Sequence, residues 1–244
     1  MIAVSAQQQG GGPNPNRVPD AFEAALAAGK KSAWLDDVLF NYAQWMEYQG
    51  RVHIDEEGAL AHRPDYVKAV ALYRRLLAEF KEGETRYRDE AQNRLDDLVK
   101  PAVSVGVDTF FLPDSEISFM AAWRNVKKVD YTLYALDLVK DVNLEGRGDQ
   151  SWLEAINTAD LKKVHTLKKD TRDDGTHQPG LDVMKVDQTL APGAYLLVAS
   201  AKGASARELV LVTDAALALK TGGSKALAWF CNALDGAPLP GTPV

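Results

Sequence analysis

Apolar residues in the first hundred positions recur at intervals of three and four, a pattern that predicts helices. We expect a short helix that Asp20 caps and Gly29 ends, because Asp favours the N-cap and Gly the position after the last turn. A second helix is predicted from Ser32 to Gly50. Its apolar side chains are Leu35, Val38, Leu39, Tyr42, Trp45 and Met46.

Two more helices follow a charged loop and form a helical hairpin. Pro64 and Asp65 predict the start of the third, and the fourth is expected from about Thr85 until Pro101 stops it. The spacing of small and large residues between Ala69 and Leu95 resembles a tetratricopeptide-type unit. Such helices either offer a concave surface to a peptide or form a platform that packs on its neighbour. Exposed rings at Tyr66, Tyr73 and Tyr87 would favour the peptide-binding alternative.

Beyond Pro101 the apolar period changes to two, which is typical of strands with one buried face. The alternating runs are Val103 to Val107, Ile117 to Trp123, Val129 to Ala135, Tyr195 to Ala199, Leu209 to Thr213 and Leu217 to Leu219. Turn signals between the runs favour an antiparallel sandwich of about seven strands. The connection from Asp141 to Lys163 is long enough to hold a short helix. The fold class predicted is therefore α+β, with antiparallel helices followed by an immunoglobulin-like sandwich.

The segment Leu190 to Tyr195 carries the sharpest signal for the sandwich. Pro192 fixes φ at the second turn position, and we expect Gly193 to take the positive φ that follows. The Tyr195 hydroxyl is then placed to bond back across the corner.

The first residues have too little apolar area to offset the cost of ordering, so residues 1–19 are predicted to be a disordered leader. Val4, Ser5 and Ala6 have the small-x-small form of a signal-peptidase site, which fits the remnant of a secretory signal. A start rich in Ala and Gln explains the same residues, and both interpretations stay open.

Composition narrows the classes of function. The 244 residues carry 28 Lys and Arg against 34 Asp and Glu, a formal net charge of −6, which disfavours general binding to nucleic acid or anionic lipid. No apolar run approaches the roughly 18 residues that cross a bilayer. The single cysteine permits no intramolecular disulfide and no cysteine-built zinc site.

The order of elements resembles the N-terminal region of bacterial α2-macroglobulin-like proteins over roughly residues 65–244. The stretch from Ser118 to Leu138, with its Arg124-Asn125-Val126 step, and the Pro192-Gly193-Ala194-Tyr195 entry into a strand carry the resemblance. The apolar spacing predicts helical hairpins over 20–100, and the resemblance implies a macroglobulin-like sandwich over 101–220. Residues 221–244 resemble the first strand of a following, truncated sandwich, since one strand and a turn cannot bury a face alone.

Members of that family are large periplasmic or surface proteins that entrap proteases, many with an internal thioester in a Cys-x-Glu-Gln setting. Here Cys231 is followed by Asn232, Ala233 and Leu234, so the thioester does not carry over. Its alternation with Leu227 and Trp229 predicts a core-facing strand residue. The resemblance implies a scaffold.

Other groups of polar residues are better explained as loops and turns than as binding or catalytic sites. His53, Asp55, Glu56, Glu57 and His62 fit a charged loop more readily than a metal site, because no spacing fixes them on one face. The run from Asp170 to Gly175 fails as a calcium loop, since aligning Gly175 to the sixth position puts Leu181 where the bidentate Glu belongs, and we expect a hairpin turn. Arg147-Gly148-Asp149 matches an adhesion tripeptide or a flexible loop. Gly10-Gly11-Gly12 has no preceding strand for a phosphate loop.

The sequence therefore predicts a non-catalytic scaffold, with no catalytic, cofactor-binding or metal-binding residue assigned and no cofactor. The resemblance implies export to the periplasm or cell surface. It also implies further domains of a longer chain as partners, with proteases or envelope proteins as other candidates. The alternative is a tetratricopeptide-like peptide-binding adaptor with the sandwich as a spacer. An enzyme is disfavoured, because four scattered histidines suggest no catalytic constellation.

Overall fold

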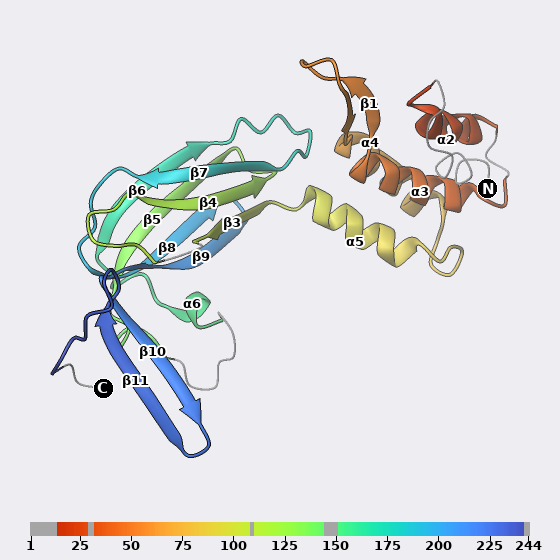
Figure 1. Ribbon diagram of the computed structural model, residues 1–244. Coiled ribbons are helices and arrows are strands. Elements are labelled where there is room, and N and C mark those ends of the chain that lie inside the picture. Colours follow the sequence, from red (N-terminus) through yellow and green to blue (C-terminus); the bar gives the residue numbers. More distant parts are fainter. Residues whose placement is uncertain (1–13, 29–31, 108–109, 144–150, 242–244) are drawn as a thin grey trace. The chain divides into compact units, whose positions relative to one another are not determined.

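The computed structural model describes residues 14–28, 32–107, 110–143 and 151–241. The chain forms two compact units, Met1–Lys100 with Asp173–Gln178, and Pro101–Arg172 with Pro179–Val244. Helices dominate the first unit and antiparallel sheets the second (Figure 1). The predicted α+β class is confirmed. The leader at residues 1–13, with the signal-peptidase-like Val4 to Ala6 and the three glycines, lies outside the described residues.

The first unit contains the four predicted helices, α2 (Arg17–Ala27), α3 (Leu35–Tyr48), α4 (Tyr66–Glu79) and α5 (Arg88–Val99). Asp65 caps α4 as predicted, since its Oδ1 accepts a hydrogen bond from the Lys68 amide at 2.8 Å. The prediction that Asp20 caps the first helix is wrong: Asn16 is the N-cap residue of α2. The Asn16 side chain exchanges two hydrogen bonds with the Val52 backbone, at 2.8 and 2.9 Å, and this pairing fixes where the helix begins.

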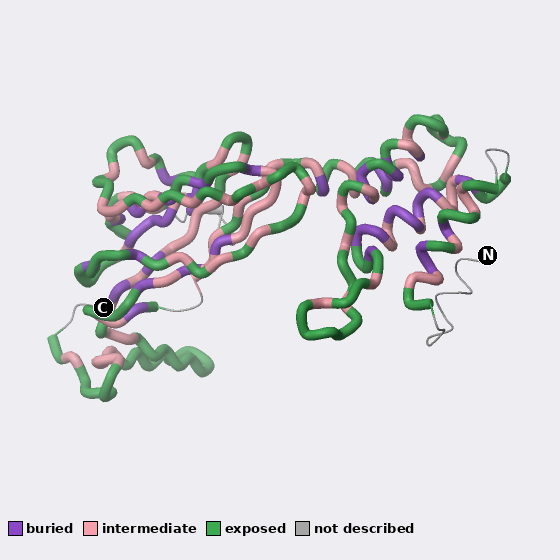
Figure 2. The backbone as a smooth tube through the Cα atoms, turned by 90° about the horizontal axis from the view of Figure 1, so that it is seen from above, coloured by how far each residue is buried: buried purple, intermediate pink, exposed green. Residues whose placement is uncertain are grey.

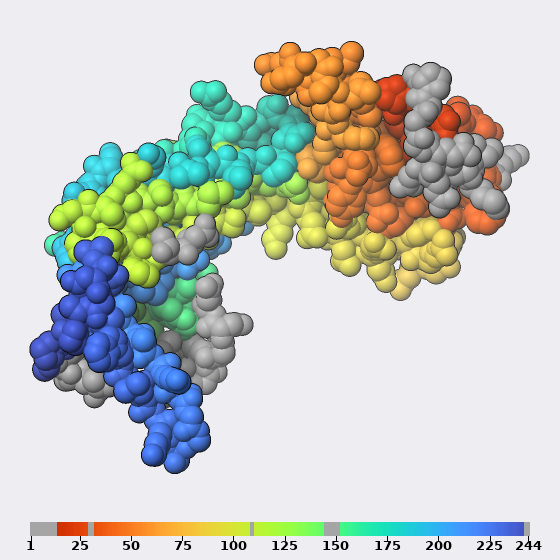
Figure 3. Space-filling view, in the orientation of Figure 1, coloured from red at the N-terminus to blue at the C-terminus, as the bar shows by residue number. Residues whose placement is uncertain are grey.

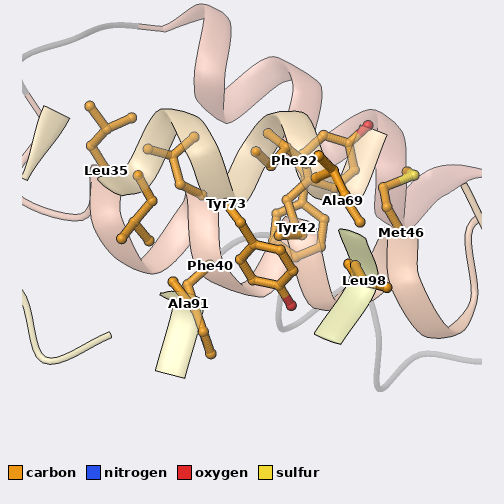
Figure 4. Close-up of a cluster of buried hydrophobic side chains, with 14 of the residues drawn as sticks. Phe22, Leu35, Phe40, Tyr42, Met46, Ala69, Tyr73, Ala91 and Leu98 are labelled. Carbon is orange, nitrogen blue, oxygen red and sulfur yellow. The ribbon is translucent and has the colours of Figure 1, made fainter. Parts of the chain in front are cut away.

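Large side chains of all four helices meet in one core (Figure 4). Phe22 stacks on Tyr42 with ring centroids 5.0 Å apart, and Phe40 stacks on Tyr87 at 4.4 Å. Tyr73 is fully buried at the centre of the cluster. The three-and-four spacing seen in the sequence is therefore the spacing of the buried stripe.

The predicted charged loop after α3 is instead a short hairpin of β1 (Arg51–Ile54) and β2 (Leu60–Arg63). Gly50 precedes it with a φ of 64°, and a Cβ at this position would lie 1.7 Å from the Arg63 carbonyl oxygen. The close approach of backbone to backbone at the base of the hairpin therefore requires glycine.

Seven strands of the second unit form two antiparallel sheets whose inner faces share one core, as predicted in number for this part of the chain. One sheet has the order β3-β4-β7 and the other β6-β5-β8-β9. The strands are β3 (Ala102–Gly106), β4 (Ile117–Arg124), β5 (Lys128–Leu136), β6 (Lys163–Asp170), β7 (Gly180–Val186), β8 (Gly193–Ala201) and β9 (Ala204–Val212). Phe119 and Tyr131 meet between the sheets with ring centroids 5.3 Å apart.

Two details of the strand assignment differ from the prediction. The connection from Asp170 to Gly175 is not a hairpin turn, because β6 and β7 lie in different sheets. The run Leu217 to Leu219 does not belong to the sandwich: it lies in β10 (Ala215–Gly222), which pairs only with β11 (Lys225–Asn232) among the described strands. The expected boundary between residues 220 and 221 therefore falls inside a hairpin.

Two corners of the sandwich coincide with the segments that carry the family resemblance. Asn125 adopts a φ of 55° where the chain leaves β4 and crosses to β5 in the other sheet. At the second corner the Tyr195 hydroxyl donates to the Ala191 carbonyl at 2.7 Å, as predicted. Gly193 has the predicted positive φ, at 157°, and is already the first residue of β8.

The expected short helix between β5 and β6 is α6 (Ser151–Ala155). Leu153 and Ile156 pack on Leu136 and Leu196, on the outer face of the four-stranded sheet. Arg207 of β9 fixes this segment, because its guanidinium donates to the carbonyls of Leu153 and Ile156 at 2.9 and 2.7 Å.

The β10–β11 hairpin is exposed along most of its length, and none of its residues is buried (Figure 2). Two backbone bonds continue its pairing, from the Asn232 amide to the Ala237 carbonyl at 2.8 Å and from the Leu239 amide to the Phe230 carbonyl at 3.0 Å. Leu217, Leu219, Leu227 and Trp229 are 48 to 63% exposed, so this sheet has no core of its own.

Candidate functional site

Three pairs of an acidic residue and a tyrosine join the helices of the first unit. The Tyr42 hydroxyl donates to Glu23 Oε1 at 2.6 Å, Tyr73 to Glu47 Oε2 at 2.9 Å, and Tyr87 to Asp37 Oδ1 at 2.7 Å. A basic side chain completes each set: Lys68 lies 3.1 Å from Glu23, Arg86 lies 3.0 Å from Asp37, and Arg94 forms an ion pair with Glu47. These sets connect α2 with α3 and α4, α3 with α4 and α5, and α3 with the residues before α5.

Burial and hydrogen bonding shift the pKa values of these groups. Burial, helped by the neighbouring carboxylates, raises the pKa values of Tyr42, Tyr73 and Tyr87, so the phenols stay protonated and donate. The hydrogen bond from Tyr42 holds the pKa of Glu23 below its ordinary value, with a smaller contribution from Lys68. Each of the three carboxylates therefore accepts a hydrogen bond from a tyrosine of another structural element.

Glu47 is the feature of these links that sequence reasoning missed. Its residue exposure is 8%, and it is the one charged residue among the buried side chains of the described segments. The signal was present in its spacing, since Glu47 follows buried Ala43 by four positions and therefore lies on the buried face of α3. Arg94 also stacks over Tyr48, with 5.0 Å from the guanidinium carbon to the ring centroid.

The second unit has an ion pair between its two sheets. Lys169 of β6 pairs with Asp182 of β7, and the Lys169 ammonium lies 5.7 Å from the centroid of the Trp123 ring. The hydrogen bond from Lys169 lowers the pKa of Asp182. Gly180 allows this arrangement, because a Cβ there would lie 2.2 Å from the Trp123 indole nitrogen.

The charged candidates around β1 and β2 do not converge. His53 pairs with Ala61 and His62 with Val52, so the two imidazoles lie on opposite faces of the hairpin. Within the described segments, no group of three or more His, Cys, Asp or Glu side chains is placed to hold a metal ion. A pocket of about 370 Å³ within the first unit is lined by Arg51, His53, Arg63, Pro64, Asp65, Tyr66, Val67, Thr176 and Gln178.

The acidic run after β6 bonds to its own backbone. Asp170 accepts from the Arg172 amide at 3.0 Å, and Asp174 accepts from both the amide and the hydroxyl of Thr176 at 3.0 and 2.6 Å. The Thr176 hydroxyl is the main cause that lowers the pKa of Asp174. These are local turn contacts of the kind that Asp favours. The Arg147 to Asp149 tripeptide lies outside the described residues.

The rings that would favour a peptide groove lie in or against the core of the first unit. Tyr73 is fully buried, while Tyr66 and Tyr87 are partly buried against the same cluster. The rings therefore do not supply the exposed groove on which the adaptor alternative depends. A tetratricopeptide-like character of the hairpin of α4 and α5 stays a prediction.

Cys231 is half-buried on β11, opposite Ala216. It shares a face with Leu227 and Trp229, as the alternation predicted, but both of those side chains are exposed. The expectation that this face points into a core is therefore wrong for the described residues. No helix of the described segments is long and apolar enough to cross a bilayer.

Comparison with known proteins gives matches among solved structures alone, since no protein-family model and no curated protein matches the sequence. One similar structure is a fragment of native alpha-2-macroglobulin from Escherichia coli spanning domains MG0-NIE-MG1, with 15% identity and a TM-score of 0.40 over 58% of this chain and 48% of that one. Another, spanning NIE-MG1 of the same protein, gives 12% identity and a TM-score of 0.33 over 58% and 74% of the two chains.

A third similar structure is the sulfur carrier protein SoxY from Chlorobium limicola f thiosulfatophilum, with 10% identity and a TM-score of 0.22 over 52% of this chain and 98% of that one. The chain spans about half the length of the MG0-NIE-MG1 fragment, 48%. The family that the sequence resembles is the family of the two Escherichia coli fragments.

Proposed function

We propose that this chain is a non-catalytic scaffold segment of an exported bacterial α2-macroglobulin-type protein, which contributes to protease entrapment in the cell envelope. In this role the chain positions other parts of a longer protein and carries out no reaction. Its partners are then further domains of that protein, and proteases are the targets that the assembled protein entraps.

The observation that carries the proposal is the position, at two corners of the sandwich, of the residues that carry the family resemblance. Asn125, with its φ of 55°, and buried Val126 form the crossing between the two sheets, and Tyr195 closes the corner before β8. Asparagine tolerates the left-handed backbone at this crossing, and a tyrosine corner is a feature of immunoglobulin-like sandwiches. The residues of the resemblance therefore have a structural role, which is what a scaffold requires.

The polar networks support the same proposal. Glu47, Asp37 and Glu23 each accept a tyrosine hydroxyl and pair with a base, and Lys169 and Asp182 join the two sheets. These groups hold elements together through hydrogen bonds and ion pairs, which is a structural role.

The proposal is tested in the cells that encode the chain, with an antibody raised against residues 101–213. Fractionation should recover the antigen with the periplasmic or surface material, and native gels should show its mobility change after the cells meet an active protease. The same protease inactivated by an active-site inhibitor is the control and should leave the mobility unchanged. Recovery with the cytoplasmic marker alone would overturn the assignment.

A further inference from the structure

The hairpin of β1 and β2 gathers basic side chains on one of its faces. In Figure 3 this hairpin, coloured orange, stands out from the surface of the first unit. Arg51 and Arg63 lie directly opposite each other in its register, and His53 follows two positions along β1, so all three side chains point to the same side. The Cβ atoms of such an opposed pair are about 4.5–5.5 Å apart, and like charges placed there repel each other.

Acidic side chains nearby compensate this charge only in part. Arg51 donates to Asp20 Oδ1 at 2.5 Å, while the other oxygen of Asp20 accepts from Asn14 at 2.9 Å. The Arg63 guanidinium has no ion-pair partner within the described part of the chain. Arginine presents its N–H donors in a planar fork that matches the two oxygens of a carboxylate. The face therefore has more donors than acceptors.

The same three basic residues line the pocket of about 370 Å³ in the first unit. Pro64 and the first turn of α4 add an apolar surface to it, and the Val67 side chain there is 51% exposed. The volume lies at the lower end of the range for small-molecule sites, about 300–1,000 Å³. The pocket thus combines a basic wall with apolar surface for a compact ligand.

Charge indicates which anion suits the pocket. Two arginines and one aspartate, Asp65, are among its lining residues, which leaves one positive charge in excess when His53 is neutral. Asp65 already holds the start of α4, because its Oδ1 accepts from the Lys68 amide at 2.8 Å. A carboxylate brings one negative charge and only acceptors, whereas a phosphate monoester brings nearly two charges at neutral pH. A single carboxylate is the closer match.

From these features we propose that the pocket binds the carboxylate of a compact apolar acid. Arg63 and Arg51 hold the carboxylate between them, which relieves the repulsion of the opposed pair, and the apolar body lies against Pro64 and Val67. A free organic acid and the last residue of a peptide chain supply the same chemistry. The site is compatible with the scaffold role and does not depend on it.

The test is titration of the ¹⁵N-labelled full chain, followed by two-dimensional NMR. The probes are 3-phenylpropionate as a free acid, N-acetylphenylalanine as the end of a peptide, and N-acetylphenylalaninamide as its uncharged counterpart. Both acids should shift the amide signals of residues 51–54 and 63–67 and reach saturation. The amide should bind about tenfold or more weakly, because a hydrogen bond between charged groups is lost. Tighter binding of N-acetylphenylalanine than of 3-phenylpropionate would identify a peptide end as the ligand, and the reverse a free acid.

Variants assign the binding to the basic face. Arg63→Gln should raise the Kd of either acid about tenfold or more, and Arg63→Lys should recover part of the loss, since lysine keeps the charge without the fork. Arg74→Gln is the matched control, because Arg74 is also an exposed arginine but lies on α4 outside the lining, and it should leave the Kd unchanged. Circular dichroism establishes that each variant is folded.

Three results would overturn the proposal. Equal affinity for N-acetylphenylalanine and its amide would show that no carboxylate is recognised. An unchanged Kd in Arg63→Gln, or the same loss in Arg74→Gln, would place the binding elsewhere or reduce it to general attraction by positive charge. Tighter binding of inorganic phosphate than of both acids would replace the carboxylate with a more highly charged anion.

Discussion

Removing the Glu47 carboxylate should destabilise the helical unit far more than removing an exposed carboxylate. In Glu47→Ala the hydroxyl of fully buried Tyr73 loses its acceptor, and a buried donor without a partner costs about 1–3 kcal/mol. Arg94 loses its ion pair too, but its side chain is 26% exposed, so water compensates and the loss adds about 1 kcal/mol or less. We therefore expect a loss of about 3 kcal/mol in the free energy of unfolding.

The measurement is urea unfolding of the full chain, followed by circular dichroism at 222 nm, where the helices dominate. Two related variants divide the effect: Glu47→Gln keeps an acceptor for Tyr73 and should cost about 1 kcal/mol, and Tyr73→Phe should also cost about 1 kcal/mol. Glu79→Ala is the control, since its pair with Arg75 spans one turn of α4 near the surface and contributes at most about 0.5 kcal/mol. If Glu47→Ala cost no more than Glu79→Ala, the link that we assign to Glu47 would be refuted.

Three further predictions concern the corner, the inter-sheet packing and the response to acid. Tyr195→Phe removes the bond to the Ala191 carbonyl and should cost the sandwich about 1 kcal/mol in thermal unfolding; an unchanged melting temperature would contradict the corner's role. Gly180→Ala places a Cβ against the indole of Trp123 and should cost about 1–3 kcal/mol with a shift in tryptophan emission, and an unaltered spectrum would refute the close contact. Because the folded-state pKa of Glu23 is lowered from 4.5, its contribution is present above that pH and is lost as the pH falls through the lowered value. Wild type and Glu23→Gln should therefore differ in stability at pH 7 and converge in acid, whereas a constant difference down to pH 2 would contradict the shift.

The helices could be predicted closely where local rules decide. The periodicity from Tyr66 to Phe80 and the Asp65 cap are properties of one segment, and α4 begins where they place it. The start of α2 could not be found this way, because Asn16 is held by the backbone of Val52, 36 residues later. Contacts of that sequence separation leave no periodic signal.

Two of the edge strands, β6 and β7, were harder to predict than the other strands of the sandwich. The period of two marked β4, β5 and β8, whose inner faces are continuous apolar rows. Strands β6 and β7 lie at sheet edges and alternate with lysine and aspartate, so their apolar rows are short. The alternation at Leu217 and Leu219 correctly indicated a strand, but alternation does not say which strand pairs with it.

The hydrogen bonds between tyrosines and acidic residues could not be predicted from the sequence, for a similar reason. The residues of the three acid and tyrosine pairs lie 19 to 50 positions apart, and only the packing of α2, α3, α4 and the start of α5 brings them together. The Tyr195 corner was predictable because its partner, Ala191, lies four residues away. Local motifs could be predicted, and contacts between distant elements could not.

The measurement that tests the scaffold proposal most directly is recovery of the native protein from the envelope of cells challenged with an active protease. Antibody against residues 101–213 should isolate a complex in which peptides of this chain and of the protease are found together by mass spectrometry after mild cross-linking. We expect an inhibitor-blocked protease to be absent from the complex. Recovery of the chain from the cytoplasm, without protease under either condition, would contradict the scaffold proposal.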